Sequence, residues 1–135
     1  DDSESRGLGD VYKRQLRNVA KASLVCMMAG ADFIKTSTGK ESINANLNNS
    51  LVMLRMIRDF YTKTGKKIGF KPAGGISTAK SVLEFLILVA EELGFEWVNP
   101  KLLRIGASSL LIDIERQLYH YTSGRYANKE KLAIG

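Results

Sequence analysis

Asp32-Phe-Ile-Lys-Thr-Ser-Thr38 is a short apolar and β-branched run followed by Gly39, and it predicts a buried strand that runs into a loop. The same arrangement recurs at Ile68-Gly-Phe-Lys-Pro72 and at Leu102-Leu-Arg-Ile-Gly106. The lysines of the first two runs are 36 residues apart, and the third run ends 35 residues after the second lysine. A strand therefore returns at a nearly constant interval along the chain.

Helical periodicity fills the segments around these strands. Apolar residues recur at helical spacing over residues 16–28, 46–61, 82–93 and 109–121, and a glycine follows each segment. Ser77 is the residue expected to cap the third of these helices. Repeated strand–helix units predict an α/β protein with a parallel sheet, which is either doubly wound or closed into a (β/α)₈ TIM barrel of about 31 residues per unit. Three units cannot close a barrel by themselves.

The chain has the size of one domain or of part of one, with 135 residues of which 44% are apolar. Residues 1–15 show neither helical nor strand periodicity, and we expect them to be a non-native or disordered leader. Residues 16–124 hold the repeated units, and residues 125–135 are expected to form a C-terminal tail.

Composition narrows the classes of partner and compartment. The 20 Lys and Arg exceed the 14 Asp and Glu by 6, which favours anionic partners, but the basic residues form no stripe with interleaved aromatics and no nucleic-acid partner is expected. Cys26 is the only cysteine, which fits a reducing, cytoplasmic setting, and it is expected to be packed beside Met27. The longest apolar run, residues 85–90, is far shorter than the roughly 20 residues of a spanning helix, so no membrane partner is expected.

Lys35 and Lys71 lie within predicted buried strands, where lysine is rare. The alternative is that these lysines face solvent on edge strands. The matching positions of the two lysines in successive units make this alternative less favoured. If both enter one cavity, each ammonium disfavours charging of the other, and one amine is then expected to be neutral near pH 7. A neutral lysine amine attacks carbonyls, which predicts Schiff-base chemistry at an adjacent carbon–carbon bond.

Glycine and hydroxyl residues follow the last two strands, as Gly74-Gly75 and as Gly106-Ala-Ser108-Ser109. Backbone N–H groups in such turns at helix starts bind phosphate, although each motif alone is also compatible with an ordinary tight turn and cap. TIM barrels frequently place a phosphate site after their seventh and eighth strands. The three units are therefore predicted to be the sixth, seventh and eighth.

Three segments together resemble the signature strands of the deoxyribose-phosphate aldolase family, in its animal-type branch. They are Gly30-Ala-Asp-Phe-Ile-Lys-Thr-Ser-Thr-Gly-Lys40, Gly69-Phe-Lys-Pro-Ala-Gly-Gly-Ile76 and Arg104-Ile-Gly-Ala-Ser-Ser-Leu-Leu111. They occur in the family's order and spacing, and the resemblance runs from about residue 16 to 128. It implies a C-terminal part of a TIM-barrel lyase that cleaves 2-deoxy-D-ribose 5-phosphate to D-glyceraldehyde 3-phosphate and acetaldehyde in deoxyribonucleoside catabolism, with neither metal nor cofactor.

The resemblance also implies a role for individual residues. Lys35 would form the Schiff base, and Lys71 would be the neighbouring lysine that favours its neutral form and assists proton transfer. Thr38 would line the pocket near the imine. The residues implied to surround the substrate phosphate are Gly39, Lys40, Gly74, Gly75, Gly106, Ser108 and Ser109.

The same resemblance implies that five barrel strands and a catalytic aspartate precede the residues present here. We therefore expect this chain alone to be inactive or very slow. The strand that carries Lys35 would have an exposed edge. Such an edge is a route to self-association, so a homo-oligomer is one expected state of the chain. Two alternatives remain: a phosphosugar-binding barrel such as an isomerase, in which the lysines only neutralise an anionic substrate, and a fragment without catalytic function.

Overall fold

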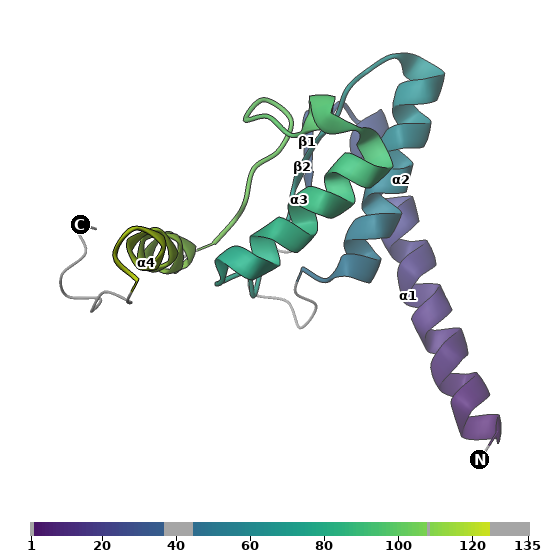
Figure 1. The fold of residues 1–135 in the computed structure, drawn as a ribbon. Coiled ribbons are helices and arrows are strands. Elements are labelled where there is room, and N and C mark those ends of the chain that lie inside the picture. The colour runs from purple at the N-terminus through teal and green to yellow at the C-terminus, as the bar shows by residue number, and fades with distance from the viewer. Residues whose placement is uncertain (1, 37–44, 108, 125–135) are drawn as a thin grey trace.

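The computed structural model describes residues 2–36, 45–107 and 109–124, with the backbone alone over residues 2–8. The element order alternates helices with two short strands (Figure 1). The elements are α1 (Asp2–Met28), β1 (Phe33–Lys35), α2 (Leu47–Thr64), β2 (Gly69–Lys71), α3 (Ala79–Leu93), the 3₁₀ helix η1 (Phe95–Trp97) and α4 (Leu110–Ser123).

The strands run parallel, as the repeat predicts. In β1 and β2 the paired residues are Phe33 with Gly69, Ile34 with Phe70, and Lys35 with Lys71. The third predicted strand is wrong as a continuous element, since residues 102–106 meet β2 only through two isolated parallel bridges. Pro72 accounts for the interruption, because proline has no N–H to donate to the neighbouring strand.

Helix boundaries follow local capping groups. The side chain of Asn46 accepts a hydrogen bond from the Asn49 N–H at 2.7 Å and starts α2, as the periodicity predicts. The prediction for α3 is wrong by one residue, because Thr78 and not Ser77 is its cap and accepts from the Ser81 N–H at 3.2 Å. Gly65 ends α2 in a left-handed conformation with φ of 76°, which a side chain would strain.

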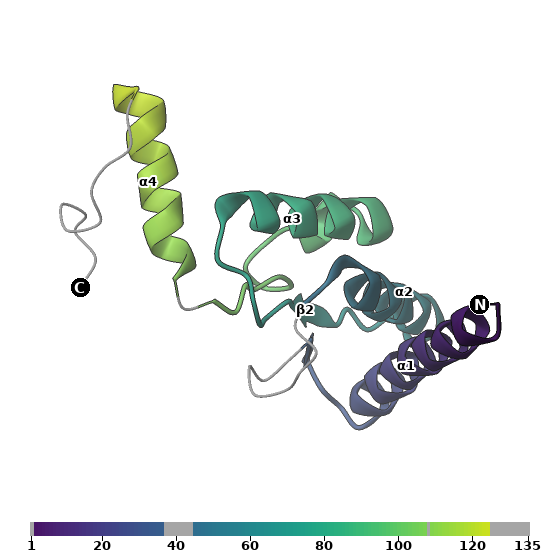
Figure 2. The ribbon, with the colours of Figure 1, turned by 90° about the horizontal axis from the view of Figure 1, so that it is seen from below.

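The core lies between one face of the strands and the helices. Figure 2 shows α1, α2 and α3 gathered on one side of β2, with α4 extending away from them. Ile34 and Phe70, the paired residues at the centre of the strands, are buried on this helical side. The rest of the main cluster of buried residues is Met27, Met53, Leu54, Ile57, Ile68, Val89, Trp97 and Leu103.

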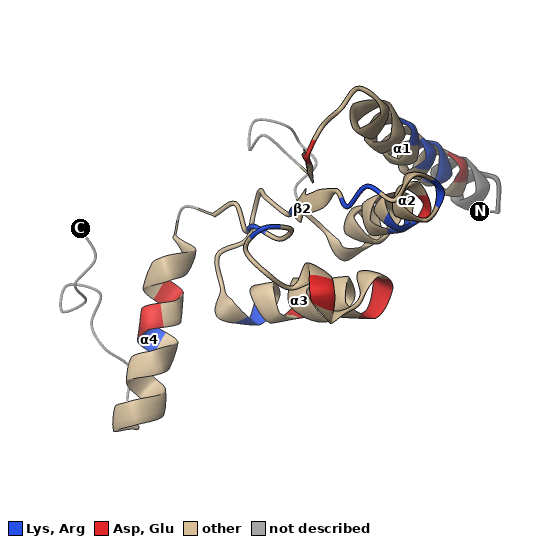
Figure 3. Ribbon diagram, turned by 90° about the horizontal axis from the view of Figure 1, so that it is seen from above, with Lys and Arg blue, Asp and Glu red and all other residues tan. Residues whose placement is uncertain are grey.

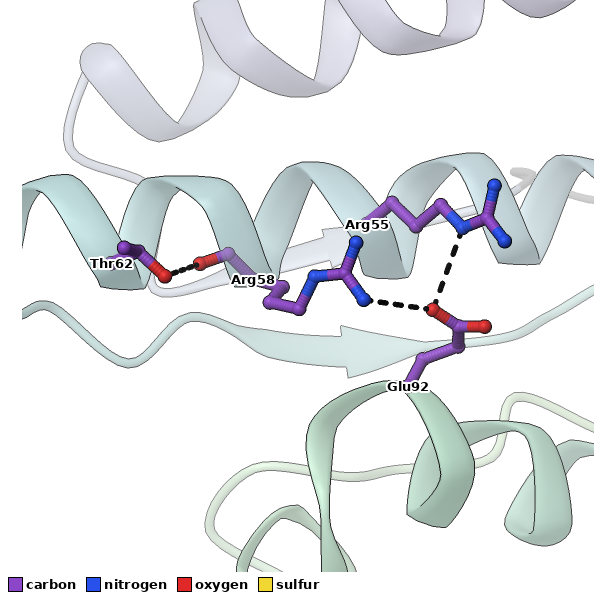
Figure 4. A network of polar contacts seen from close by, with 4 residues as sticks. All are labelled: Arg55, Arg58, Thr62 and Glu92. Carbon is purple, nitrogen blue, oxygen red and sulfur yellow. Dashed lines mark hydrogen bonds and ion pairs between the residues drawn. The ribbon is translucent and has the colours of Figure 1, made fainter.

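A polar network joins α2 to α3 at the edge of this core (Figure 4). Glu92 accepts from Arg55 Nε at 3.5 Å and from Arg58 Nη1 at 3.4 Å, and its side chain is only 16% exposed. The two arginine side chains are about half exposed, so the pairs are worth at most about 1 kcal/mol each. Their contribution is to fix the orientation of two helices that already pack through apolar residues.

The N-terminal residues and Cys26 correct two expectations. Residues 1–15 were expected to be a non-native or disordered leader, but the structure describes a helix, α1, that begins at Asp2. A helix that is already anchored extends at little cost per residue, so this part needs no apolar stripe of its own. Cys26 is exposed and not packed, because each residue is rotated by about 100° from the next around a helix and only the face that carries Met27 points to the core.

Charged residues are distributed over all the helices. Figure 3 shows Lys and Arg on each helix from α1 to α4, with Asp and Glu among them. Among the described residues, no helix is long and apolar enough to cross a membrane.

Candidate active site at the carboxyl ends of the strands

Lys35 and Lys71 are direct neighbours across the parallel strands. Each is the last residue of its strand, and the two are register partners. Because side chains alternate along a strand, both lie on the face opposite to the buried Ile34 and Phe70. The 36-residue repeat of the sequence therefore brings both lysines to one level of one sheet face.

The exposure of the two lysines differs from the expectation of a buried cavity. Lys35 is exposed and Lys71 is half-buried. In the described part of the chain, β1 pairs with a strand on one side only, and Lys35 lines an open hollow together with Ala22 and Cys26 of α1. The lysine face is therefore open to solvent here.

Thr36 links the two loops that follow the lysines. Its hydroxyl donates to the Ala73 carbonyl at 2.8 Å and accepts from the Ala73 N–H at 2.8 Å, and its own N–H donates to the Lys71 carbonyl at 3.3 Å. Sequence reasoning missed Thr36, because its partners lie 35 and 37 residues downstream and no local pattern identifies them. This residue holds the carboxyl ends of β1 and β2 in register immediately beyond the lysines.

Gly106 lies against Lys71. A Cβ at position 106 would be 2.6 Å from the Cβ of Ala73 and 3.2 Å from Cε of Lys71. The Gly106 N–H donates to the Pro72 carbonyl at 2.9 Å, which fixes this close approach. The absence of a side chain at position 106 therefore leaves room for the side chain of Lys71.

Arg104 adds a third cation to this face. The bridge of Phe70 to Leu103 places the next residues, Lys71 and Arg104, side by side. The guanidinium of Arg104 lies 4.4 Å from the centroid of the Phe33 ring, which itself lies against Gly69, and makes a cation–π contact. Lys35, Lys71 and Arg104 thus stand on three neighbouring backbone segments, and their combined charge favours an anionic ligand.

The glycine-rich turns lie beyond the lysines, in front of α3 and α4. Gly74 and Gly75 have φ of 92° and 78°, a left-handed pair that residues with side chains rarely adopt. Ser109 is the N-cap residue of α4, and its hydroxyl makes no capping hydrogen bond. It lines a cavity of about 220 Å³ together with Ser77, Ile112, Asp113 and Arg116. The remaining predicted residues of this region lie outside the described residues: Thr38, Gly39, Lys40 and Ser108.

The described residues hold no group of three or more His, Cys, Asp or Glu side chains that could bind a metal ion. The titratable side chains of the lysine face are cations, and the face ends in backbone N–H groups and hydroxyls. Such a site combines amines for attack on a carbonyl with groups that bind an anion.

Comparison with known proteins identifies a family for this chain. A family described as DeoC/LacD family aldolase matches residues 5–111. The chain belongs to this aldolase family. The match begins within the residues predicted to be a leader.

Several relatives of this DeoC/LacD family chain are named as deoxyribose-phosphate aldolases. A deoxyribose-phosphate aldolase of Mus musculus is 70% identical over 112 residues, and that of Homo sapiens is 67% identical over 112 residues. The match covers 83% of this chain but only 35% of each relative. A protein of Caenorhabditis elegans called a putative deoxyribose-phosphate aldolase is 56% identical over 100 residues.

A solved structure of a putative deoxyribose-phosphate aldolase from Toxoplasma gondii has the same fold. It superposes with a TM-score of 0.64 at 20% sequence identity, over 76% of this chain and 41% of that one. The α/β assignment is thereby confirmed, with parallel strands and helices that correspond to part of an aldolase domain.

Proposed function

We propose that this chain is the Schiff-base-forming part of a class I deoxyribose-phosphate aldolase. The observation that carries the proposal is the pairing of Lys35 with Lys71 in register at the carboxyl ends of two parallel strands. Its substrate is 2-deoxy-D-ribose 5-phosphate, and its products are D-glyceraldehyde 3-phosphate and acetaldehyde. The whole domain is a cytoplasmic (β/α)₈ barrel, and this chain supplies its last three units.

The chemistry follows from the lysine face. The amine of Lys35 attacks the aldehyde of the open-chain sugar, and with the uptake of one proton water leaves to give a protonated imine. The hydroxyl on the third carbon of the sugar gives up its proton as the bond between the second and third carbons breaks. The electron pair of that bond passes into the imine to leave an enamine, and glyceraldehyde 3-phosphate is released. A proton then returns to the remaining two-carbon unit, and hydrolysis releases acetaldehyde and the free lysine. Lys71 is the register partner of Lys35 and is assigned the proton transfers.

The phosphate of the sugar binds beyond the lysines. Gly74, Gly75 and Ser109 lie there, and the sequence predicts that Gly39, Lys40 and Ser108 also bind the phosphate. The cations of the lysine face, Arg104 included, favour the approach of the anion. The rest of the domain would enclose this face. The chain matches only 35% of the mouse relative, so the enclosing part lies outside the match.

Reductive trapping tests the proposal. The protein for the test is a chimera, in which the 112 matching residues of the mouse relative are replaced by those of this chain. Incubation with deoxyribose 5-phosphate and borohydride is expected to leave a reduced adduct on Lys35, located by peptide mass spectrometry. An adduct on Lys71 would show that Lys71 forms the Schiff base and that Lys35 is its neighbour. A folded chimera without any adduct would contradict Schiff-base chemistry and favour a barrel that only binds phosphosugars.

Replacement of Gly106 by alanine tests the packing beneath Lys71. The added methyl group would overlap Ala73 and press on Cε of Lys71, so Gly106→Ala is expected to cost about 1–3 kcal/mol of unfolding free energy and to slow cleavage. The double variant Ala73→Gly, Gly106→Ala removes the nearer contact and is expected to recover most of the stability but not the rate. Urea unfolding and steady-state kinetics of the chimera measure the two effects. If the double variant recovers both the stability and the cleavage rate, the clash with Ala73 alone explains the losses, and the contact with Lys71 does not contribute.

A further inference from the structure

Asp113 connects the two helices that follow the glycine-rich turns. It lies in the first turn of α4, and its Oδ2 accepts a hydrogen bond of 2.7 Å from the backbone N–H of Ala79, the first residue of α3. The bond is partly buried and joins residues 34 apart in sequence. It therefore links the start of one helix directly to the start of the next.

This bond completes the cap of α3. The N–H groups of the first helical turn have no partner within their own helix. Thr78 satisfies the N–H of Ser81, and Asp113 satisfies that of Ala79. A carboxylate at this end also interacts favourably with the helix dipole. The start of α3 is therefore held by a side chain of α4.

An apolar cluster brings α4 to this position. Ile76, from the turn before α3, packs with Phe85 of α3 and Leu110 of α4, and all three are buried. Ile105 and Ile114 pack against this cluster from the third strand segment and from α4. Figure 2 shows the far end of α4 standing away from the other elements. The contact between α3 and α4 thus lies within their first two turns, and Asp113 makes a hydrogen bond across it.

We infer that Asp113 is a positioning residue that sets the separation of the two phosphate-binding turns, Gly74-Gly75 and Ser109, and thereby the preference for a phosphorylated sugar. The inference rests on the proposed function. Asp113 lines the same cavity as Ser109, but its charge repels phosphate and its Oδ2 is engaged by the Ala79 N–H, so it acts through the turns and not as a ligand.

The test compares cleavage of deoxyribose 5-phosphate with cleavage of unphosphorylated deoxyribose by the chimera. Loss of one capping bond corresponds to about 1 kcal/mol, so Asp113→Ala is expected to raise KM for the phosphorylated sugar by roughly three- to tenfold. Cleavage of the unphosphorylated sugar is expected to stay within about twofold, because it does not use the turns. Asp113→Asn keeps an acceptor at this position and is expected to restore KM. Glu115→Ala, which removes an acidic side chain from the same helix, controls for charge.

The possible results separate two failures. A chimera that cleaves neither sugar overturns the proposed function and this inference with it. With an active chimera, equal losses for both sugars in Asp113→Ala would indicate a merely structural role and overturn the inference alone. An Asn variant as impaired as the Ala variant, or an unchanged KM in Asp113→Ala, would do the same.

Discussion

Lys35→Arg in the chimera is expected to lower kcat/KM for deoxyribose 5-phosphate on the order of 10⁴-fold or more, because a guanidinium keeps the charge but does not form the imine. The borohydride adduct should disappear with it. A coupled assay for glyceraldehyde 3-phosphate measures the rate, and peptide mass spectrometry measures the adduct. Lys71→Arg retains a cation beside Lys35 and should leave a slower but detectable adduct.

Lys63→Arg is the matched control for this substitution. Lys63 is exposed in the last turn of α2, at the opposite end of β2 from Lys71. Its replacement should change kcat/KM by less than about twofold, since it touches none of the site residues. Substantial cleavage by a folded Lys35→Arg chimera would contradict the assigned nucleophile, whatever the behaviour of the control.

Trp97→Ala is expected to lower the free energy of unfolding by about 3–5 kcal/mol. The side chain is 2% exposed, its Nε1 donates to the Ile68 carbonyl at 2.9 Å, and its ring meets that of Tyr61 edge to face at 5.3 Å between centroids. Removal leaves a cavity behind β2 and a buried carbonyl without its partner. Urea unfolding of the chimera should be followed by far-UV circular dichroism, because the substitution removes the one tryptophan of this chain and so changes the fluorescence signal itself.

Phe95→Ala provides the comparison within the same short helix. Phe95 is 83% exposed, so its truncation should change the unfolding free energy by less than about 0.5 kcal/mol. Equal effects of the two substitutions would show that η1 does not pack on the core as described.

Lys67 covers the Trp97 ring, with Nζ 5.6 Å from the ring centroid, and its hydrogen bond to Glu96 raises the pKa of Lys67.

Local sequence was sufficient for most of the element types. The helices over residues 46–61 and 109–121 were predicted to within a few residues, because their apolar spacing and the glycines after them act within one or two turns. Residues 102–106 were predicted as a strand, but the proline of the neighbouring strand removes one donor of the ladder and leaves two bridges. The conformation of residues 2–15 was missed, because a helix can extend from an anchored segment without periodicity of its own.

By itself, the sequence determined the repeat, the alternation of strands and helices, and the family to which Lys35 and Lys71 point. These follow from spacing and residue type, which act locally. Only the tertiary structure decided which residues meet: the register of Lys35 with Lys71, the Thr36 bonds to Ala73, the approach of Gly106 to Lys71, and the bond from Ala79 to Asp113. Each of these contacts joins residues that are 34 to 37 apart in sequence. Such contacts depend on how the strand–helix units pack against one another.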